Sequence, residues 1–259
     1  MDPALCTMDS KQTFGLIGYP LGHSFSRAFF TEKFQREGID AEYLNFPIEH
    51  VDSLPRIIRE HPTLRGLNVT LPHKQAVIPF LDELSPEAER IGAVNVIRIS
   101  RQNGQTRLKG FNSDVIGFRE SLRPLLLPHH RRALVLGTGG ASRAVCAGLE
   151  QLGLEWTYVS RSPRPDGLTY DQLSPQTLAE YLVIVNCSPV GMFPHTDECP
   201  ALPYEALTPR HLLFDLVYNP LETLFMRRGA AQGATVKNGL EMLHLQALTS
   251  WDFWNAQDR

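Results

Sequence analysis

Near its middle the chain carries the stretch Ala133-Leu134-Val135-Leu136-Gly137-Thr138-Gly139-Gly140-Ala141-Ser142-Arg143-Ala144. Its apolar start predicts a short buried strand, and the glycine-rich turn that follows opens a helix expected to run to Leu152. In a dinucleotide-binding turn Gly137 would allow the tight bend, Gly139 would let the backbone approach a pyrophosphate, and Ser142 would fill the third small position. The helix N-terminus would then offer N–H groups to the phosphates. An ordinary strand-to-helix turn is the alternative interpretation.

The strand predicted next, at residues 156–159, indicates which dinucleotide this turn would bind. It leads into Ser160-Arg161-Ser162, with Arg164 close behind. An acidic residue at this point would bond the ribose 2′-hydroxyl of NAD. Arginine instead suits a 2′-phosphate, because its planar guanidinium pairs with phosphate oxygens. The sequence therefore favours NADP, and the alternative is that Arg161 is a solvated surface charge.

Strands and helices alternate along the chain, which predicts an α/β fold with a mainly parallel sheet. Further strands are expected at 13–18, 42–46, 64–70, 182–185 and 212–216, and a hairpin of 93–99 and 105–109 around Asn103-Gly104. Helices are expected at 27–37, 51–60, 72–80, 113–126 and 238–254. Ser26 is a candidate N-cap of the first of these, with Ser24 in the loop before it. Residues 128–132 are interpreted as an exposed joint between domains.

Composition excludes several classes of protein. A length of 259 residues allows two modest domains, and a net charge of −3 gives no indication of a nucleic-acid or anionic-membrane partner. The apolar runs are too short to cross a bilayer, and residues 1–13 lack a signal-peptide core. The 4 cysteines have no metal-ligand spacing, so no metal is expected. We expect a cytoplasmic protein with reduced thiols.

Short polar clusters end several apolar runs in the first half of the chain. They are Gly66 to Lys74, Gly92 to Asn95 and Gly110 to Asp114. Lys74 and Asp114 could form a structural ion pair. Beside a nicotinamide-binding domain they would have a chemical role, because oxidising an alcohol needs a hydride acceptor and a group that takes the hydroxyl proton.

Along nearly its whole length the chain resembles the shikimate dehydrogenase family. Besides the turn at Gly137, the resemblance rests on these motifs, in the family's order: His23-Ser24-Phe25-Ser26, Asn68-Val69-Thr70-Leu71-Pro72-His73-Lys74, Gly92-Ala93-Val94-Asn95, Asn112-Ser113-Asp114-Val115-Ile116-Gly117, Asn186-Cys187-Ser188-Pro189-Val190-Gly191-Met192, Asp215-Leu216-Val217-Tyr218-Asn219-Pro220 and Asn238-Gly239-Leu240-Glu241-Met242-Leu243-His244-Leu245-Gln246-Ala247.

The resemblance implies reversible, NADPH-dependent reduction of 3-dehydroshikimate to shikimate, on the route to chorismate and the aromatic amino acids. It implies catalytic roles for Lys74 and Asp114, and it leaves open which of them takes the proton. For substrate binding it implies Ser24 and Ser26 on the carboxylate, with Asn68, Thr70, Asn95, Tyr218 and Gln246 around the rest of the substrate. For the cofactor it implies Gly137, Thr138, Gly139, Gly140 and Ala141 at the pyrophosphate, Ser160, Arg161, Ser162 and Arg164 at the 2′-phosphate, and Leu216 and Gly239 at the nicotinamide.

The resemblance also implies two α/β domains. Residues 1–112 and 240–259 would bind substrate, the C-terminal helix returning to that domain, and residues 113–239 would form a Rossmann-type NADP domain. Some positions depart from the family's usual pattern. Arg27 replaces a proline, Ser160-Arg161-Ser162 replaces Asn-Arg-Thr, and Arg164 falls one residue earlier than the family's second arginine.

Other functions remain open on sequence alone. A quinate/shikimate dehydrogenase of broader substrate range would share this pattern, although such enzymes often use NAD, which Arg161 disfavours. A non-catalytic ligand sensor on the same fold would be indicated by loss of Lys74 or Asp114, and both are present. The expected partner is a small-molecule substrate, and the protein is expected to be a monomer or homodimer.

Overall fold

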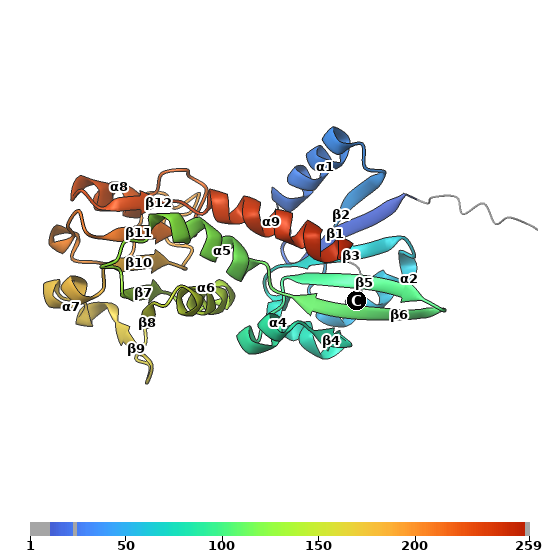
Figure 1. Ribbon diagram of the computed structural model, residues 1–259, viewed down its shortest axis with the longest axis horizontal. Helices are drawn as coiled ribbons and strands as arrows, with labels where there is room; N and C mark the ends of the chain where they lie inside the picture. Colours follow the sequence, from blue (N-terminus) through green and yellow to red (C-terminus); the bar gives the residue numbers. More distant parts are fainter. Residues whose placement is uncertain (1–10, 23–24, 257–259) are drawn as a thin grey trace, which may run out of the picture. The chain divides into compact units, whose positions relative to one another are not determined.

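The computed structural model describes residues 11–22 and 25–256 (Figure 1). The chain divides into two compact units. Unit 1 is Met1–Asn112 with Ser250–Arg259, and unit 2 is Ser113–Thr249. Helix α9 (Leu240–Asn255) therefore gives residues 240–249 to unit 2 and 250–255 to unit 1. In the described part of the chain, no helix is long and apolar enough to cross a membrane.

Unit 1 is built on a mixed sheet, in the strand order β2-β1-β3-β5-β6-β4. The strands are β1 (Gln12–Gly18), β2 (Ala41–Pro47), β3 (Leu64–Val69), β4 (Glu83–Leu84), β5 (Val96–Gln102) and β6 (Gln105–Phe111). Strand β1 runs parallel to β2 and β3, whereas β5 is antiparallel to both β3 and β6. The β5–β6 hairpin is confirmed, and its turn residues Asn103 and Gly104 have φ of 52° and 75°, as a type I′ turn requires.

The helical segments of unit 1 are α1 (Phe25–Glu37), η1 (Val51–Ser53), α2 (Leu54–Glu60), α3 (His73–Ala76), η2 (Ile78–Phe80) and α4 (Pro86–Ile91). Two sequence predictions about them are wrong. Helix α1 begins at Phe25, so Ser26 lies in its first turn rather than at its N-cap. The helix expected at 72–80 is two short pieces, because Pro79 has no N–H for the bond that would continue α3.

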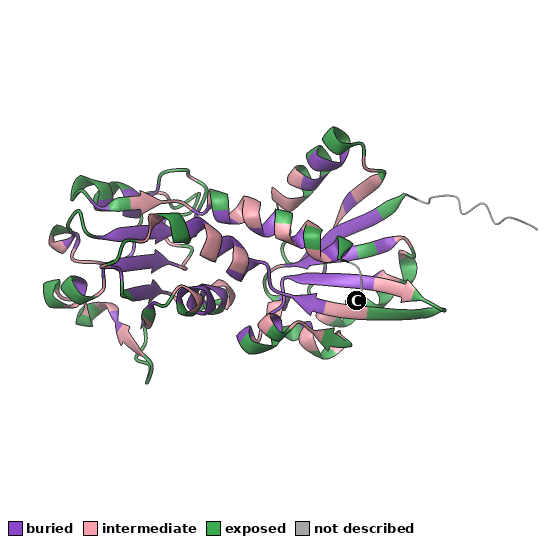
Figure 2. Cartoon of the chain, viewed as in Figure 1, coloured by how far each residue is buried: buried purple, intermediate pink, exposed green. Residues whose placement is uncertain are grey.

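The central strands of the unit 1 sheet, β1, β3 and β5, are largely buried and are mostly purple in Figure 2. One face carries aliphatic side chains such as Leu67, Val69 and Ile97, packed against residues of α2, η2 and α4. On the other face Phe14 packs against Trp254, which lies at the end of α9. A Cβ built on Gly66 would lie 2.3 Å from the Trp254 indole, so only glycine lets α9 approach β3 this closely.

Unit 2 holds an all-parallel sheet, in the order β12-β11-β10-β7-β8-β9. The strands are β7 (Arg132–Leu136), β8 (Glu155–Ser160), β9 (Gly167–Thr169), β10 (Val183–Asn186), β11 (Leu212–Asp215) and β12 (Thr235–Lys237). The chain moves outward from β7 to β9, returns to the middle at β10, and moves outward again on the other side. This is the doubly wound order, and its switch point lies between β7 and β10, where such sheets bind ligands. The predicted Rossmann-type fold is confirmed.

The helical segments of unit 2, besides α9, are α5 (Asp114–Leu122), η3 (Arg123–Leu125), α6 (Gly140–Gln151), η4 (Tyr170–Gln172), α7 (Pro175–Glu180), η5 (Tyr204–Ala206) and α8 (Leu224–Ala231). Strand β7 shows how both faces are buried. Val135 joins one cluster with Phe118 of α5 and Leu149 of α6, whereas Leu134 joins another with Phe225 of α8.

Two further predictions about unit 2 are wrong. The helix expected at 113–126 ends as an α-helix at Leu122, because Pro124 follows and a 3-10 turn replaces it. Residues 128–132 lie inside unit 2 rather than at a joint. His130 is buried there, and its Nε2 donates to the Arg210 carbonyl at 3.0 Å.

Candidate active site

The glycine-rich turn lies at the carboxyl end of β7, at the switch point of unit 2. Gly137 has φ of +100°, and a Cβ there would stand 3.3 Å from the Ser188 nitrogen. Gly139 precedes α6 without a side-chain cap, and a Cβ built on it meets nothing within 4 Å. The first N–H groups of α6 therefore have no side chain to cap them, and open space adjoins the turn. Both features fit a dinucleotide pyrophosphate.

The side chain of Ser142 stabilises this turn by a hydrogen bond. Its side chain is fully buried, and its hydroxyl donates to the Gly139 carbonyl at 2.6 Å. The serine at the third small position thus fixes the backbone of the turn.

The two arginines after β8 differ in their surroundings. Arg161 is exposed, and within the described residues no hydrogen bond or ion pair holds its guanidinium. Arg164 is bound by Asp166, with its Nε at 2.9 Å and its Nη2 at 3.1 Å from the two carboxylate oxygens. The Ser160 hydroxyl donates to the Ser162 carbonyl at 2.5 Å, which shapes the turn that carries Arg161. Arg161 is therefore the better available partner for a phosphate.

Leu216 and Gly239 are in close contact. A Cβ on Gly239 would lie 2.2 Å from the Leu216 carbonyl oxygen, and the Gly239 nitrogen donates to Val217 at 3.1 Å. No other residue would fit at 239 without moving the segment after β11. Tyr218, in the same segment, is 39% exposed and is thus accessible to a ligand.

Asp114 and Gln246 lie on neighbouring helices of unit 2. Asp114 is the first residue of α5 and is buried. Ser113 beside it donates to Gln246 Oε1 at 3.4 Å. The helices approach closely at Gly117, where a Cβ would lie 2.7 Å from the Met242 carbonyl oxygen. A carboxylate next to a helix N-terminus is electrostatically stabilised.

In unit 1 the predicted residues follow the carboxyl end of β3. Thr70 comes directly after β3, and its methyl group occupies the space that a side chain on Gly18 would take. Lys74 is half-buried in the single turn of α3, and its carbonyl accepts from the Val94 nitrogen at 2.7 Å. The preceding His73 donates from Nε2 to the Ile48 carbonyl at 2.7 Å. The backbone around Lys74 is therefore anchored on both sides.

Asn68 belongs to a buried hydrogen-bond network that we did not predict. Its Oδ1 accepts from the Tyr43 hydroxyl at 2.7 Å, and its Nδ2 donates to the Ser250 hydroxyl at 3.0 Å. Burial raises the pKa of Tyr43, and a hydrogen bond with Ser26 opposes this shift. Ser26 and Asn68 are thus connected through Tyr43. A tyrosine in the strand predicted at 42–46 is the signal in the sequence, because its hydroxyl must find a partner when the ring is buried.

Asn95 lies beside this network, and its main chain is held between two strands. Its nitrogen donates to Phe111 at 3.0 Å, its carbonyl accepts from Val69 at 2.8 Å, and its side chain is buried. Ser24 lies outside the described residues. Lys74 and Asp114 belong to different compact units.

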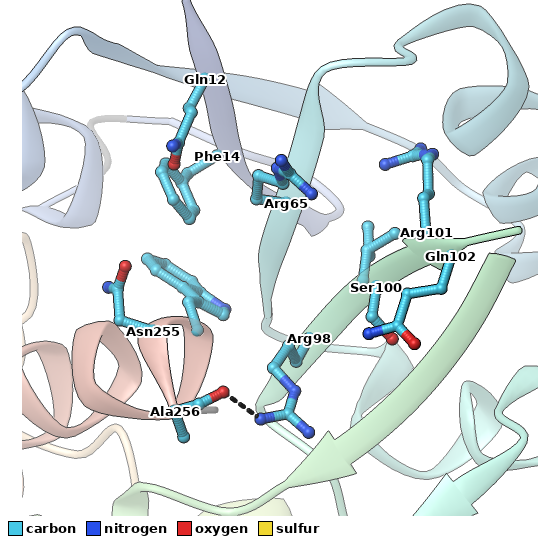
Figure 3. Close-up of a pocket in the computed structure, with 11 residues that line it drawn as sticks. Gln12, Phe14, Arg65, Arg98, Ser100, Arg101, Gln102, Asn255 and Ala256 are labelled. Atoms are coloured by element: carbon cyan, nitrogen blue, oxygen red, sulfur yellow. Dashed lines mark hydrogen bonds between the residues drawn. The ribbon is translucent and has the colours of Figure 1, made fainter. Parts of the chain in front are cut away.

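A separate polar pocket of about 280 Å³ lies in unit 1 (Figure 3). None of the predicted site residues lines it within the described chain. Its buried Arg98 donates to the Ala256 carbonyl at 2.7 Å, the bond drawn in Figure 3, and so holds the end of α9. Arg101 donates to the carbonyls of Ile58 and His61 and holds the end of α2. These arginines have structural partners, so we do not assign the site here.

The described part of the chain offers neither a cluster of metal ligands nor a reactive thiol at Cys146 or Cys187. No group of His, Cys, Asp or Glu side chains there could hold a metal ion. Burial raises the pKa of Cys187, and it raises the pKa of Cys146 to about 12. Both are therefore protonated at neutral pH and unsuited to act as nucleophiles.

Residues 16–97 match the family model of the shikimate dehydrogenase substrate binding domain. A shikimate dehydrogenase (NADP(+)) of Desulforamulus reducens is 36% identical, over 96% of this chain and 92% of the relative. One of Syntrophomonas wolfei is 40% identical, over 92% and 88%. The solved shikimate 5-dehydrogenase of Thermus thermophilus, in complex with NADP(H) and shikimate, is similar at a TM-score of 0.81 and 35% identity, covering 94% of this chain and 93% of that one. With this identity over nearly its whole length, on the two-unit α/β fold described above, the chain belongs to the shikimate dehydrogenase family.

Proposed function

We propose that this protein is an NADP-dependent shikimate dehydrogenase, which reversibly reduces 3-dehydroshikimate to shikimate in chorismate and aromatic amino acid biosynthesis. The observation that carries the proposal is the switch point of unit 2. There the uncapped N-terminus of α6 follows the turn at Gly137, and Arg161 follows the neighbouring strand without a partner in the described chain. This combination suits a dinucleotide with a 2′-phosphate. Family membership supplies the substrate class.

The cofactor residues divide by the part of NADP that they would hold. Residues 137–141 would bind the pyrophosphate through backbone N–H groups, and Arg161 the 2′-phosphate, with Ser160 and Ser162 shaping its turn. Arg164, paired with Asp166, would contribute less than Arg161. Leu216 and Gly239 would lie by the nicotinamide, which supplies the hydride acceptor for shikimate oxidation.

We assign the substrate carboxylate to Ser24, Ser26 and Tyr218, and the substrate hydroxyls to Thr70, Asn95, Asp114 and Gln246. Asn68 is different, because both donors of its amide lie near protein acceptors: Ser250 Oγ at 3.0 Å and the Asn95 carbonyl at 3.5 Å. Tyr43 fills one of the two acceptor positions on its Oδ1. Asn68 would therefore offer the substrate at most one acceptor, and its main role would be to hold the wall of the site.

Lys74 and Asp114 would carry the proton chemistry. In the oxidation direction the substrate hydroxyl loses its proton to a side chain while its carbon gives up a hydride. A lysine amine that accepts this proton must be neutral at that moment, whereas a carboxylate can accept or orient it directly. We assign the transfer to the pair, with Asp114 also binding substrate.

The proposed division of labour gives substrate binding to residues 1–112 and 240–259 and NADP binding to residues 113–239. The compact units divide within α9, after Thr249, so Gln246 counts with unit 2. We further infer a cytoplasmic enzyme, acting as a monomer or homodimer on a small molecule, without a nucleic-acid or membrane partner.

The experiment that tests this function compares shikimate and quinate side by side, each with NADP⁺ and with NAD⁺. We expect efficient turnover only with shikimate and NADP⁺. Comparable kcat/KM for quinate would instead indicate the broader quinate/shikimate dehydrogenase. Binding of NADP⁺ and shikimate without any turnover would indicate a ligand sensor.

A further inference from the structure

Asn186 and Asp215 are the last residues of neighbouring parallel strands, β10 and β11, and they are partners in the register. Both side chains are fully buried. The Asp215 Oδ1 accepts from Asn186 Nδ2 at 2.9 Å and from the Val217 nitrogen at 3.0 Å, and its Oδ2 accepts from the Thr223 hydroxyl at 2.6 Å. No cation pairs with this carboxylate among the described residues, so neutral donors alone support a buried charge.

The first of these bonds leads toward the glycine-rich turn. The Asn186 amide also donates to the Val190 carbonyl at 3.3 Å, and its oxygen accepts from the nitrogen and the hydroxyl of Ser188, at 3.1 and 2.6 Å. Flipping the amide would set its oxygen against the Asp215 carboxylate, so Asp215 determines its orientation. The Ser188 nitrogen stands 3.3 Å from the Cβ position of Gly137. The hydrogen bonds that run from Asp215 through Asn186 to Ser188 therefore end at the turn proposed to bind pyrophosphate.

The other two bonds lead toward the segment after β11. Val217 follows Leu216, and its carbonyl accepts from the Gly239 nitrogen. Thr223 accepts from the Met226 nitrogen at 3.3 Å and so caps α8. The segment 216–223, which carries Tyr218, is thus fixed near both of its ends by one carboxylate.

We propose that Asp215 is a positioning residue that sets, from one buried carboxylate, the positions of two segments of the proposed cofactor site. One segment is 187–190, against Gly137, and the other is 216–223. Asp215 itself touches neither substrate nor cofactor in this role. The inference rests on the proposed function, because it takes the NADP site to lie at this switch point.

The test compares Asp215→Ala, Asp215→Asn and a matched control, His211→Ala. His211 comes just before the opposite end of β11 and is also buried, with hydrogen bonds to the Leu178 carbonyl at 2.9 Å and the Thr208 nitrogen at 3.0 Å. Its loss should destabilise unit 2 without moving either segment. The readouts are the Kd for NADP⁺ by fluorescence titration, the urea midpoint, and kcat and KM with shikimate.

Asp215→Ala should raise the Kd for NADP⁺ about 10-fold or more and lower kcat on the order of 10²-fold, since small displacements of reacting groups are costly. His211→Ala should lower the urea midpoint comparably and leave Kd and kcat near wild type. Asp215→Asn keeps an acceptor for Asn186 and Val217, so it should recover most of the NADP⁺ affinity. Equal Kd values for Asp215→Ala and His211→Ala would overturn the proposal, as would an Asp215→Asn variant as defective as alanine. Because the titration needs no turnover, it decides the role of Asp215 even if shikimate is not the substrate.

Discussion

The hydroxyl of Tyr43 donates a hydrogen bond to the side-chain oxygen of Asn68 at 2.7 Å, and both side chains are buried. Tyr43 is in β2 and Asn68 in β3, which are separated by β1 in the sheet. The hydroxyl of Ser250, in α9, accepts a hydrogen bond from the nitrogen of the same Asn68 side-chain amide. One asparagine therefore connects the sheet of unit 1 to the last helix, beside the residues proposed to bind substrate.

Replacing Tyr43 with phenylalanine should destabilise unit 1. The substitution leaves the buried Asn68 oxygen without its donor, which costs about 1–3 kcal/mol in unfolding free energy. Urea denaturation checks this. The control is Tyr181→Phe, whose hydroxyl pairs with Thr157 at 3.0 Å in a partly exposed place where water can replace it. Equal losses of unfolding free energy in the two variants would show that the buried Tyr43–Asn68 hydrogen bond stabilises the protein no more than the partly exposed Tyr181–Thr157 one.

Arg161→Ala should lower the preference for NADP⁺. A charge-assisted hydrogen bond is worth about 1.5–3 kcal/mol, so KM for NADP⁺ should rise about ten-fold or more while KM for NAD⁺ hardly changes. Initial rates with both cofactors measure this. Arg164→Ala is the matched control, because Asp166 already binds that guanidinium. Equal losses with both cofactors in Arg161→Ala would rule out a 2′-phosphate contact.

The Asp215 carboxyl should give stability a specific pH dependence. Burial raises its pKa to about 6 from 3.8, although hydrogen bonds from Thr223, Val217 and Asn186 oppose the shift. Between these two pKa values the carboxyl is protonated in the folded state and ionised in the unfolded state. Proton binding by Asp215 therefore stabilises the folded state fully below pH 3.8, and this stabilisation is lost as pH rises through about 6. Asp215→Asn cannot titrate.

Between about pH 7 and about pH 4 the unfolding free energy of wild type should therefore rise, relative to Asp215→Asn, on the order of 1–3 kcal/mol. Paired urea titrations at each pH measure the difference, and groups common to both proteins cancel. A difference that stays constant, or that falls on acidification, would contradict a raised pKa at Asp215.

Sequence reasoning worked best where local pattern and context agree. The strand before Gly137, the turn and the helix after it follow from apolar periodicity and glycine, and they were predicted correctly. The sequence pattern predicts one helix over 72–80, whereas α3 ends at Ala76, because Pro79 cannot donate the hydrogen bond that would extend it. Arg164 could have been questioned from sequence, since Asp166 lies two residues away.

The buried networks could not be predicted, because their members meet only in the fold. Asn68 and Ser250 are separated by 182 positions, and Asn186 and Asp215 by 29. No local spacing indicates which strand ends become neighbours. Asn186 and Asp215 stood out only as parts of motifs, and their shared role depends on the parallel register of β10 and β11.

The central claim is that this chain oxidises shikimate with NADP⁺ and that Lys74 takes part in the proton transfer. It is tested most directly by kcat for NADP⁺ reduction with shikimate, measured for wild type and Lys74→Ala. A general acid–base group contributes about 10²–10⁴-fold, so kcat should fall by that factor. The Kd for shikimate, from titration, should move by only a few-fold, because the other substrate residues remain. Lys109→Ala, whose ammonium pairs with Glu83, should keep the wild-type kcat. The account would be contradicted by a wild-type protein that forms no NADPH from shikimate, or by a Lys74→Ala variant with near-normal kcat.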